Sequence, residues 1–152
     1  MEFAAQAINL RKTYGRVVAV DNLNLNIPTG SVFGLLGPNG AGKSTTFGIL
    51  AGWLKPTAGQ SSVLSTPSQQ LFRLRGQVAA LPQDAAFPPQ VSVEQQLNYF
   101  GRLMGLSKSE AQKETTQVLE RVSLSEAASK KGSELSHGMA KRIGIAQALI
   151  GN

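Results

Sequence analysis

Cysteine is absent from the 152 residues, and histidine occurs once. The missing cysteines exclude a disulfide framework and any thiolate metal site, which agrees with a reducing compartment. Aromatic residues make up only 6% of the chain. No apolar run approaches the roughly 20 residues of a membrane-spanning helix, and Met1–Gln6 lacks the charged start and apolar core of a signal peptide. We therefore expect a cytoplasmic protein.

Acidic residues are also scarce, with nine Asp and Glu against 15 Lys and Arg and a net charge of +6. A basic balance can indicate nucleic acid, a membrane surface or anionic ligands. The basic residues are scattered, and pairs such as Lys130-Lys131 have no aromatic residues between them to stack on bases. Solvated helix faces explain them better, so no nucleic acid is expected. A hydrophobic content of 41% predicts a globular domain with a core.

Glycine is concentrated in one stretch that matches the phosphate-binding pattern G-x-x-x-x-G-K-[ST]. An apolar run of strand length, residues 31–36, precedes it. Residues 44–54 follow it with apolar positions at helical spacing. The stretch reads Gly37, Pro38, Asn39, Gly40, Ala41, Gly42, Lys43, Ser44, Thr45.

The chemistry of this stretch follows from its residue types. Glycines let the backbone form a concave nest of N–H groups, and the helix start adds the positive end of its dipole. Lys43 can reach the β- and γ-phosphates of a nucleotide, and the Ser44 hydroxyl can hold Mg²⁺. The alternative is a glycine-rich turn before an ordinary helix, which the flanking strand and helix disfavour.

The region before Gln83 is dominated by strand patterns. Leu23, Leu25 and Ile27 alternate with asparagines, which predicts a half-buried strand. Further strands are expected at 7–10, 31–36, 60–64 and 77–81. Turns are expected at 11–16 and 65–67.

Helical patterns dominate after Gln83. Three serines are followed three residues later by Gln or Glu, the capping-box spacing; they are Ser92, Ser107 and Ser123. These boxes predict helices at 93–104, 108–122 and 124–129. A short helix is expected at 68–75. Leu135 and Ser136 open a last helix, whose apolar face carries Ile143, Ala146, Leu149 and Ile150.

Three further stretches, in order with the glycine loop, carry a resemblance to a known family. They are Tyr14, then Leu81-Pro82-Gln83-Asp84, then Leu135-Ser136-His137-Gly138-Met139. With the Walker A motif at 37–45, the chain resembles the ATP-binding subunit of an ABC transporter over essentially its whole length. The resemblance implies an α/β fold, a P-loop NTPase of the ABC type. Such a fold has a RecA-like core, an N-terminal antiparallel β-subdomain and an inserted helical subdomain.

The resemblance implies roles for particular residues toward ATP and Mg²⁺. Tyr14 matches the aromatic that stacks on adenine; the alternative is a tyrosine packed at a strand end. Gln83 matches the Q-loop glutamine, which touches Mg²⁺ or the attacking water and senses the coupling helix of a membrane permease. Its alternative is a polar residue after a strand. Lys43 and Gln83 are thus the implied catalytic residues.

Ser136 and Gly138 match the signature motif, where backbone N–H groups and a hydroxyl form a second anion site. In the family this site faces ATP on another subunit, so the resemblance implies a head-to-tail pair. His137 and Met139 depart from the common L-S-G-G-Q form, as in ATPases of bacterial ABC-2 type exporters. His137 is either a cation facing phosphate or a tolerated exposed variant. Trp53 is expected in the core, against the P-loop helix.

The 152 residues contain no apolar strand that ends in Asp-Glu, so the Walker B region of the family is absent. Asp84, Glu94 and Glu134 do not substitute for it. We expect the chain alone to bind nucleotide poorly and not to hydrolyse it. The resemblance also implies that residues 31–36 lack their usual parallel neighbours, so we expect the isolated chain to be marginally stable, aggregation-prone or dependent on a complementing chain.

The expected organisation is an incomplete ATP-binding domain with three parts. Residues 1–90 form the β-subdomain and P-loop core, 91–135 the helical subdomain and 136–152 the signature helix. The predicted function is export, with the protein peripheral on the membrane's cytoplasmic face through its permease. The alternatives are a truncated non-catalytic binding fragment and a soluble ABC-type ATPase of DNA repair or translation. The short helical segment disfavours the last.

Overall fold

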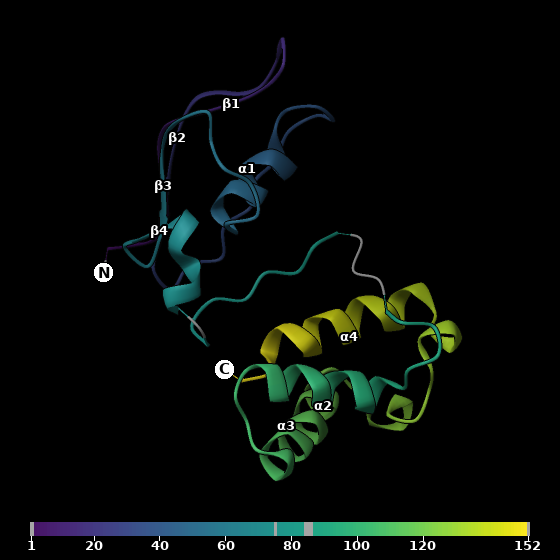
Figure 1. The fold of residues 1–152 in the computed structure, drawn as a ribbon. Helices are drawn as coiled ribbons and strands as arrows, with labels where there is room; N and C mark the ends of the chain where they lie inside the picture. The colour runs from purple at the N-terminus through teal and green to yellow at the C-terminus, as the bar shows by residue number, and fades with distance from the viewer. Residues whose placement is uncertain (1, 75, 84–86, 152) are drawn as a thin grey trace. The chain divides into compact units, whose positions relative to one another are not determined.

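The computed structural model describes residues 2–74, 76–83 and 87–151. The chain divides into two compact units, residues 1–75 and 76–152, and each unit is described by itself (Figure 1). The subdivision at residues 90 and 135 stays a prediction. Asp84, at the end of the expected Q-loop stretch, lies outside the described residues. Within the described ranges, no helix has the length and apolarity needed to cross a bilayer.

The first unit is built on an antiparallel sheet with the strand order β2-β1-β3-β4. Its long strands are β1 (Phe3–Tyr14) and β2 (Val17–Pro28), which form a hairpin. The predicted turn at 11–16 is wrong, because pairing with β2 continues β1 to Tyr14 and leaves only Gly15 and Arg16 in the turn. Gly15 has a φ of 58°, a conformation that glycine adopts without steric cost.

Two shorter strands complete the sheet. β3 (Ala58–Val63) pairs with β1, and β4 (Thr66–Pro67) pairs with β3. The predicted turn at 65–67 is therefore wrong at its end, because Thr66 and Pro67 pair with the strand before them. The 3₁₀ helix η1 (Ser68–Leu74) occupies the place of the expected short helix.

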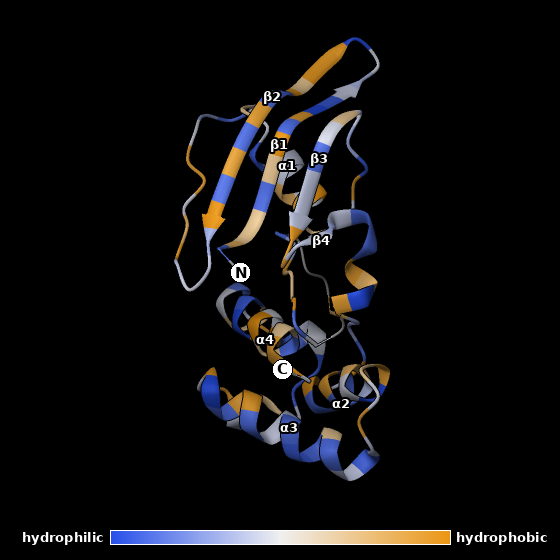
Figure 2. Cartoon of the chain, turned by 90° about the vertical axis from the view of Figure 1, so that its left-hand side faces the viewer, coloured by the Kyte–Doolittle hydropathy of each residue, from blue (hydrophilic) through white to orange (hydrophobic). Residues whose placement is uncertain are grey.

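The alternating pattern of β2 places one side of the strand toward the core. Leu23, Leu25 and Ile27 are half-buried between exposed neighbours, as expected from the period of two. The same alternation is visible as bands along β2 in Figure 2. The buried core residues of this unit form one cluster, which consists of Ala7, Leu10, Val20 and Ile49.

Ile49 belongs to α1 (Lys43–Leu50), which is shorter than the predicted helical stretch 44–54. The helix ends because Gly52 adopts a φ of 76°. The N–H of Gly52 then donates to Ile49 O at 3.0 Å, and the N–H of Trp53 to Gly48 O at 2.9 Å. This is a Schellman motif, which satisfies the last carbonyls of the helix.

Trp53 lies beyond that helix end, and its predicted place in the core is wrong. Its side chain is 51% exposed. The ring does pack on the P-loop helix, edge-on to Phe47 with a centroid distance of 5.6 Å. Phe47 is itself 44% exposed, so the pair lies at the surface of the unit.

Residues 31–38 form no strand, so the strand predicted at 31–36 is wrong. Val32 and Leu36 are almost fully exposed, at 104% and 92%. The segment that contains them follows β2 and is drawn as a loop in Figure 2. A strand exists only through hydrogen bonds to a neighbour, and every strand pair among the described residues is antiparallel. The expected lack of parallel neighbours is therefore confirmed there. The strand predicted at 77–81 is wrong for the same reason.

The second unit is a set of helices around one apolar core. Its long helices are α2 (Val93–Leu103), α3 (Lys108–Arg121) and α4 (His137–Leu149). Two 3₁₀ turns lie between α3 and α4: η2 (Ser125–Ala127) and η3 (Gly132–Glu134). The buried core residues are Val93, Leu97, Val118, Leu119, Leu124, Ala127, Ile143, Ala146 and Ile150.

Two of the three predicted capping boxes are confirmed. Ser92 and Gln95 bond reciprocally at the start of α2, and Ser107 and Glu110 do so at α3. The third, at Ser123, is wrong. Ser123 has a φ of 55° rather than the extended backbone of an N-cap. The predicted helix 124–129 is consequently reduced to the single turn η2.

The capping box at the start of α3 predicts that the stability of the fold depends on pH. The side-chain hydroxyl and the backbone N–H of Ser107 both bond the Glu110 carboxylate and lower its pKa. The contact therefore stabilises the fold at neutral pH, and its contribution falls as the pH drops through the lowered pKa. We expect Ser107→Ala to return the Glu110 pKa toward its ordinary value in an NMR titration and to flatten the acid side of the stability curve. Ser92→Ala is the matched control, because Gln95 does not titrate; equal acid curves for the two variants would contradict the prediction.

Candidate functional site

The predicted phosphate loop leads directly into α1, and two of its glycines have left-handed backbone. Gly40 has a φ of 83° and Gly42 a φ of 81°. Gly42 is the N-cap of α1 and is packed tightly, since a Cβ built on it would lie 2.4 Å from Ala19 O. The loop is further closed by a 3.2 Å hydrogen bond from Ala41 N to Pro38 O. Glycine is required at 42 by both backbone conformation and space.

Lys43 is the first residue of α1 and folds back over the loop. Its Nζ donates to Gly37 O and to Pro38 O, both at 2.7 Å. The ammonium is thus held at the mouth of the loop by two carbonyl oxygens. Phosphate oxygens are stronger acceptors for an ammonium than neutral carbonyls. An anion entering the loop can therefore take over this donor.

The start of α1 differs electrostatically from the starts of α2 and α3. Its N-cap is a glycine without a capping side chain, and its first turn contains no acidic residue. By contrast, α2 and α3 carry Glu94 and Glu110 in their first turns and have side-chain caps. The first N–H groups of a helix have no partner within the helix. At α1 they remain available to an anion, and the helix dipole favours one.

The charge of the first unit points the same way. Residues 1–75 contain seven of the basic residues and only two acidic ones, Glu2 and Asp21, for a net charge of +5. Residues 76–152 contain eight basic and seven acidic residues, a net charge of +1. The positive potential of the chain is therefore concentrated in the unit that holds the glycine loop, which favours association with anionic ligands.

Ser44 follows Lys43 in α1 and is exposed, whereas Thr45 is half-buried. A single hydroxyl suits Mg²⁺, which usually keeps several waters and is bound by one or two protein groups together with substrate phosphates. No cluster of three or more His, Asp or Glu residues exists among the described residues that would form an all-protein metal site. The donor set therefore fits a metal that arrives with a nucleotide.

Tyr14 lies at the end of β1, and its side chain is 48% exposed. The predicted alternative, a tyrosine packed at a strand end, does not describe a ring so exposed. The Nζ of Lys12 lies 5.0 Å from the ring centroid, within cation–π range. Lys12 was not predicted as a site residue, although residues two apart share one face of a strand. Tyr14 and the glycine loop belong to the same unit.

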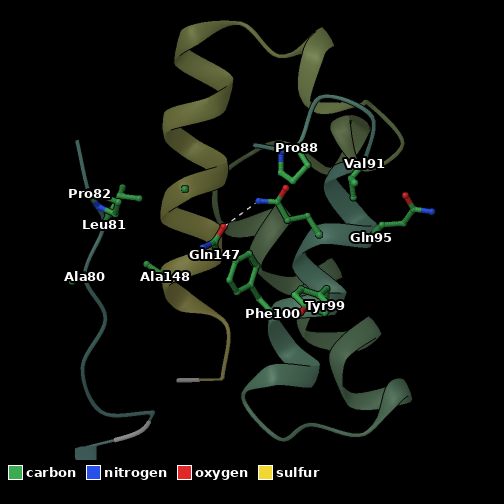
Figure 3. A pocket seen from close by; sticks show the side chains of 12 residues that line it. Ala80, Leu81, Pro82, Pro88, Val91, Gln95, Tyr99, Phe100, Gln147 and Ala148 are labelled. Carbon is green, nitrogen blue, oxygen red and sulfur yellow. Dashed lines mark hydrogen bonds between the residues drawn. The ribbon is translucent and has the colours of Figure 1, made fainter. Parts of the chain in front are cut away.

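Gln83 belongs to the second unit and is exposed. Its backbone carbonyl accepts a hydrogen bond from the Nζ of Lys141 in α4, a contact that the sequence analysis also missed. The three residues that precede Gln83 in the chain line a largely apolar cavity of about 700 Å³ (Figure 3). Its lining residues are Ala80, Leu81, Pro82, Pro88, Val91, Gln95, Gln96, Tyr99, Phe100, Gly144, Gln147 and Ala148.

The predicted signature residues form the start of α4. Ser136 is the N-cap, and its hydroxyl accepts the N–H of Met139 at 3.2 Å. The first turn of α4 contains no acidic residue. His137 and Gly138 are both exposed, and a Cβ built on Gly138 would meet nothing within 4 Å. This second helix start also suits an anion.

Residues 20–152 match the protein-family model described as ABC transporter. The chain belongs to the ABC transporter family. Its fold is accordingly that of an α/β P-loop ABC ATPase, as predicted. Curated ABC transporter relatives include the Nod factor export ATP-binding protein I of Cupriavidus metallidurans, which is 40% identical over 146 residues. The doxorubicin resistance ATP-binding protein DrrA of Mycobacterium tuberculosis is 39% identical over 156 aligned positions.

These alignments cover 95% and 98% of this chain but 48% and 46% of the two relatives. The chain thus spans about half the length of the curated relatives it matches. Among solved ABC structures, MJ0796, described as a dimeric bacterial ABC transporter cassette, matches with a TM-score of 0.87 and 26% identity. That alignment covers 97% of this chain and 70% of the other.

A second solved ABC structure, cbiO1 of Clostridium perfringens, is described as part of the transporter complex cbiONQ. It matches with a TM-score of 0.82 and 28% identity, over 99% of this chain and 62% of the other. In this chain Tyr14 and the glycine loop lie in the first unit, and Gln83 and the start of α4 lie in the second.

Proposed function

We propose that the protein is the ATP-binding subunit of an ABC exporter, which couples ATP binding and hydrolysis to export through a membrane permease. The observation that carries the proposal is the glycine loop at the start of α1. It combines left-handed glycines, helix-start amides without a side-chain cap and the Lys43 ammonium, with no carboxylate in the first turn of α1. Two relatives are named for Nod factor export and for doxorubicin resistance, and these names support the export function.

In this proposal the loop amides and Lys43 bind the phosphates of ATP. The backbone of residues 37–45 surrounds them, and Tyr14 stacks on the adenine. Ser44 would hold Mg²⁺ by its hydroxyl, and the Gln83 amide of the second unit would act on Mg²⁺ or on the attacking water. Mg²⁺, when bound, would neutralise charge on the phosphate oxygens. Lys43 stabilises the charge that develops on the transferring phosphoryl group.

The start of α4 is proposed as the partner's half of the site. Ser136 and Gly138 would face ATP bound to the P-loop of a second ATP-binding subunit. The absence of acidic residues in the first turn of α4 supports an anion there. The relative MJ0796 is described as dimeric, which agrees with function as a pair.

The permease is proposed to contact the second unit beside Gln83. The cavity of about 700 Å³ supports this, because its lining is largely apolar and joins the stretch before Gln83 to α2 and α4. The side chain of Tyr99 in α2 is 62% exposed at this cavity. The protein would thereby lie on the cytoplasmic face of the membrane.

Hydrolysis by these 152 residues alone is not expected. Glu94 lies in the first turn of α2, and the Glu134 carboxylate accepts the N–H of Lys131 at 2.6 Å. Neither ends an apolar strand, so neither is assigned as the polarising carboxylate among the residues that the structure describes. The second candidate function is therefore a non-catalytic nucleotide-binding or partner-binding fragment. The run at 31–36 specifically favours it, since Val32 and Leu36 are exposed within the first unit as the structure describes it and would suit a partner surface.

A soluble ABC-type ATPase of DNA repair or translation remains the third candidate. Proteins of that kind usually bring long insertions or tandem domains. The helical segment of this chain is short, with α2 and α3 joined by a brief turn. Co-purification with a permease encoded next to this gene would separate the exporter from this candidate.

The proposal is tested by titrating the 152-residue chain with MgATP in a calorimeter and by assaying phosphate release. We expect saturable binding, and no phosphate release above that of Lys43→Met. A longer polypeptide that adds an apolar strand ending in Asp-Glu should release phosphate, because it would supply the carboxylate. Absence of MgATP binding to both polypeptides would contradict the nucleotide-binding function. Turnover by the short chain that Lys43→Met removes would contradict the non-hydrolytic assignment.

A further inference from the structure

The ammonium of Lys12 is held at two points. It lies 5.0 Å from the centroid of the Tyr14 ring, and it donates a 2.8 Å hydrogen bond to Lys55 O. A cation over an aromatic face is attracted by the ring's quadrupole. Residues two apart on a strand share a face, which places both side chains on one side of β1. The Lys12 side chain thus links the ring to the segment that follows α1.

That segment is itself fixed to the strand end. Thr57 N donates to Arg11 O at 2.8 Å, and Thr13 N donates to Thr57 Oγ1 at 3.0 Å. The hydroxyls of Thr13 and Thr57 also lie 3.2 Å apart. The carbonyl that holds Lys12 therefore belongs to a loop with three further ties to β1. Because this loop follows the helix that begins in the P-loop, it connects the two parts of the proposed nucleotide site.

The pairing of β1 with β2 is irregular on both sides of Lys12. The register shifts once between Leu10 and Lys12 and again between Lys12 and Thr13. Such irregularities increase the local twist of a strand and re-aim its side chains, and they are frequent beside functional sites. Both shifts insert the extra residue in β2, because β2 advances one residue more than β1 at each of them. Lys12 and Tyr14 therefore keep the two-residue spacing of a regular strand, which leaves them on one face of β1.

We propose that Lys12 is a positioning residue for the adenine-stacking ring of Tyr14. The ammonium occupies one face of the ring and fixes its rotamer, which leaves the opposite face for the base. Tyr14 is 48% exposed, so a face remains accessible. The inference rests on the proposed function, in which Tyr14 stacks on adenine. Lys12 acts through the ring and not on the phosphates.

The test compares ATP with tripolyphosphate, which has the phosphates but no base. Both are titrated calorimetrically into the 152-residue chain and its variants. Lys12→Met keeps the aliphatic stem and removes the charge. We expect it to weaken ATP binding about two- to fivefold, the effect of one exposed cation–π contact, and to leave tripolyphosphate binding unchanged. Lys12→Arg should restore ATP binding, because a guanidinium also stacks on the ring.

Arg11→Met is the matched control. It removes the same charge one residue away, where the guanidinium instead bonds Asp21 at 2.7 Å. We expect it to change the affinities for ATP and for tripolyphosphate by the same factor, or not to change them at all. Circular dichroism melts identify any variant that fails to fold. If Lys12→Met fails to fold, Lys12→Arg still tests the role of the cation at position 12.

Tyr14→Ala separates the two proposals. If it leaves the ratio of ATP to tripolyphosphate affinity unchanged, adenine stacking by Tyr14 is wrong. If it lowers that ratio while Lys12→Met does not, only the role of Lys12 is overturned. In the Tyr14→Ala background, Lys12→Met should have no further effect on ATP. A further loss there, or an equal loss of tripolyphosphate binding, would show that Lys12 contacts the nucleotide directly and would also overturn the inference.

Discussion

Gly42→Ala is expected to destabilise the first unit far more than Gly40→Ala. Both glycines have nearly the same left-handed backbone, with φ values of 81° and 83°. Adding a Cβ in that conformation costs about 1–2 kcal/mol at either position. At Gly42 the Cβ would also lie 2.4 Å from Ala19 O and 3.1 Å from Val20 Cγ2, whereas at Gly40 it would meet nothing within 4 Å.

The difference between the two variants isolates the packing of the loop on β2. A Cβ 2.4 Å from a backbone oxygen cannot be accommodated by rotating a side chain, so either α1 or β2 must move. We expect a total cost of roughly 3 kcal/mol or more for Gly42→Ala, at the upper end of single substitutions. For a unit of this size, each kcal/mol lowers the melting temperature by about 4–8 °C.

The measurement is urea unfolding of the 152-residue chain, followed by circular dichroism. The signal of β1 and β2 reports the first unit, and the helical signal of α2, α3 and α4 reports the second. Gly42→Ala should lower the urea midpoint of the first unit and leave the urea midpoint of the second unit unchanged. Equal shifts from Gly40→Ala and Gly42→Ala would mean that backbone strain alone makes glycine necessary at position 42.

Lys43→Met is expected to weaken binding of ATP and of tripolyphosphate alike, by about 10- to 100-fold. A charge-assisted hydrogen bond contributes roughly 1.5–3 kcal/mol. Lys43 Nζ also bonds Gly37 O and Pro38 O at 2.7 Å each, so its removal loosens the loop that presents the amides. The equal loss for both ligands distinguishes Lys43 from Lys12, whose effect should be confined to ATP.

Lys55→Met is the control for Lys43→Met. It makes the same change of residue and charge in the same unit, and the Lys55 backbone carbonyl that holds Lys12 is retained. We expect at most a small, salt-dependent loss of affinity from it. Lys43→Arg should recover part of the binding. Calorimetric titration provides the measurement, and undiminished tripolyphosphate binding by Lys43→Met would exclude the loop as the phosphate site.

Several features were determined by the sequence because their causes are local. The glycine loop requires particular residues at 40, 42 and 43, and these can be recognised without knowing any partner segment. Ser92 and Ser107 cap their helices through groups three residues away. The alternation in β2 reports burial directly, because a strand has a period of two. These patterns predicted the loop, the long helices and the half-buried face of β2.

The remaining features depended on distant segments, so only the tertiary structure decided them. An apolar run such as 31–36 becomes a strand only if a neighbour supplies hydrogen bonds, and the described residues supply none. Trp53 was placed by the helix end at Gly52, not by its own hydrophobicity. Two further contacts join residues far apart in the chain. Gly42 packs closely on Ala19, and the backbone carbonyl of Lys55 accepts a hydrogen bond from Lys12. Sequence thus determined which residues are proposed to bind a nucleotide, whereas packing between distant segments decided how tightly those residues are held.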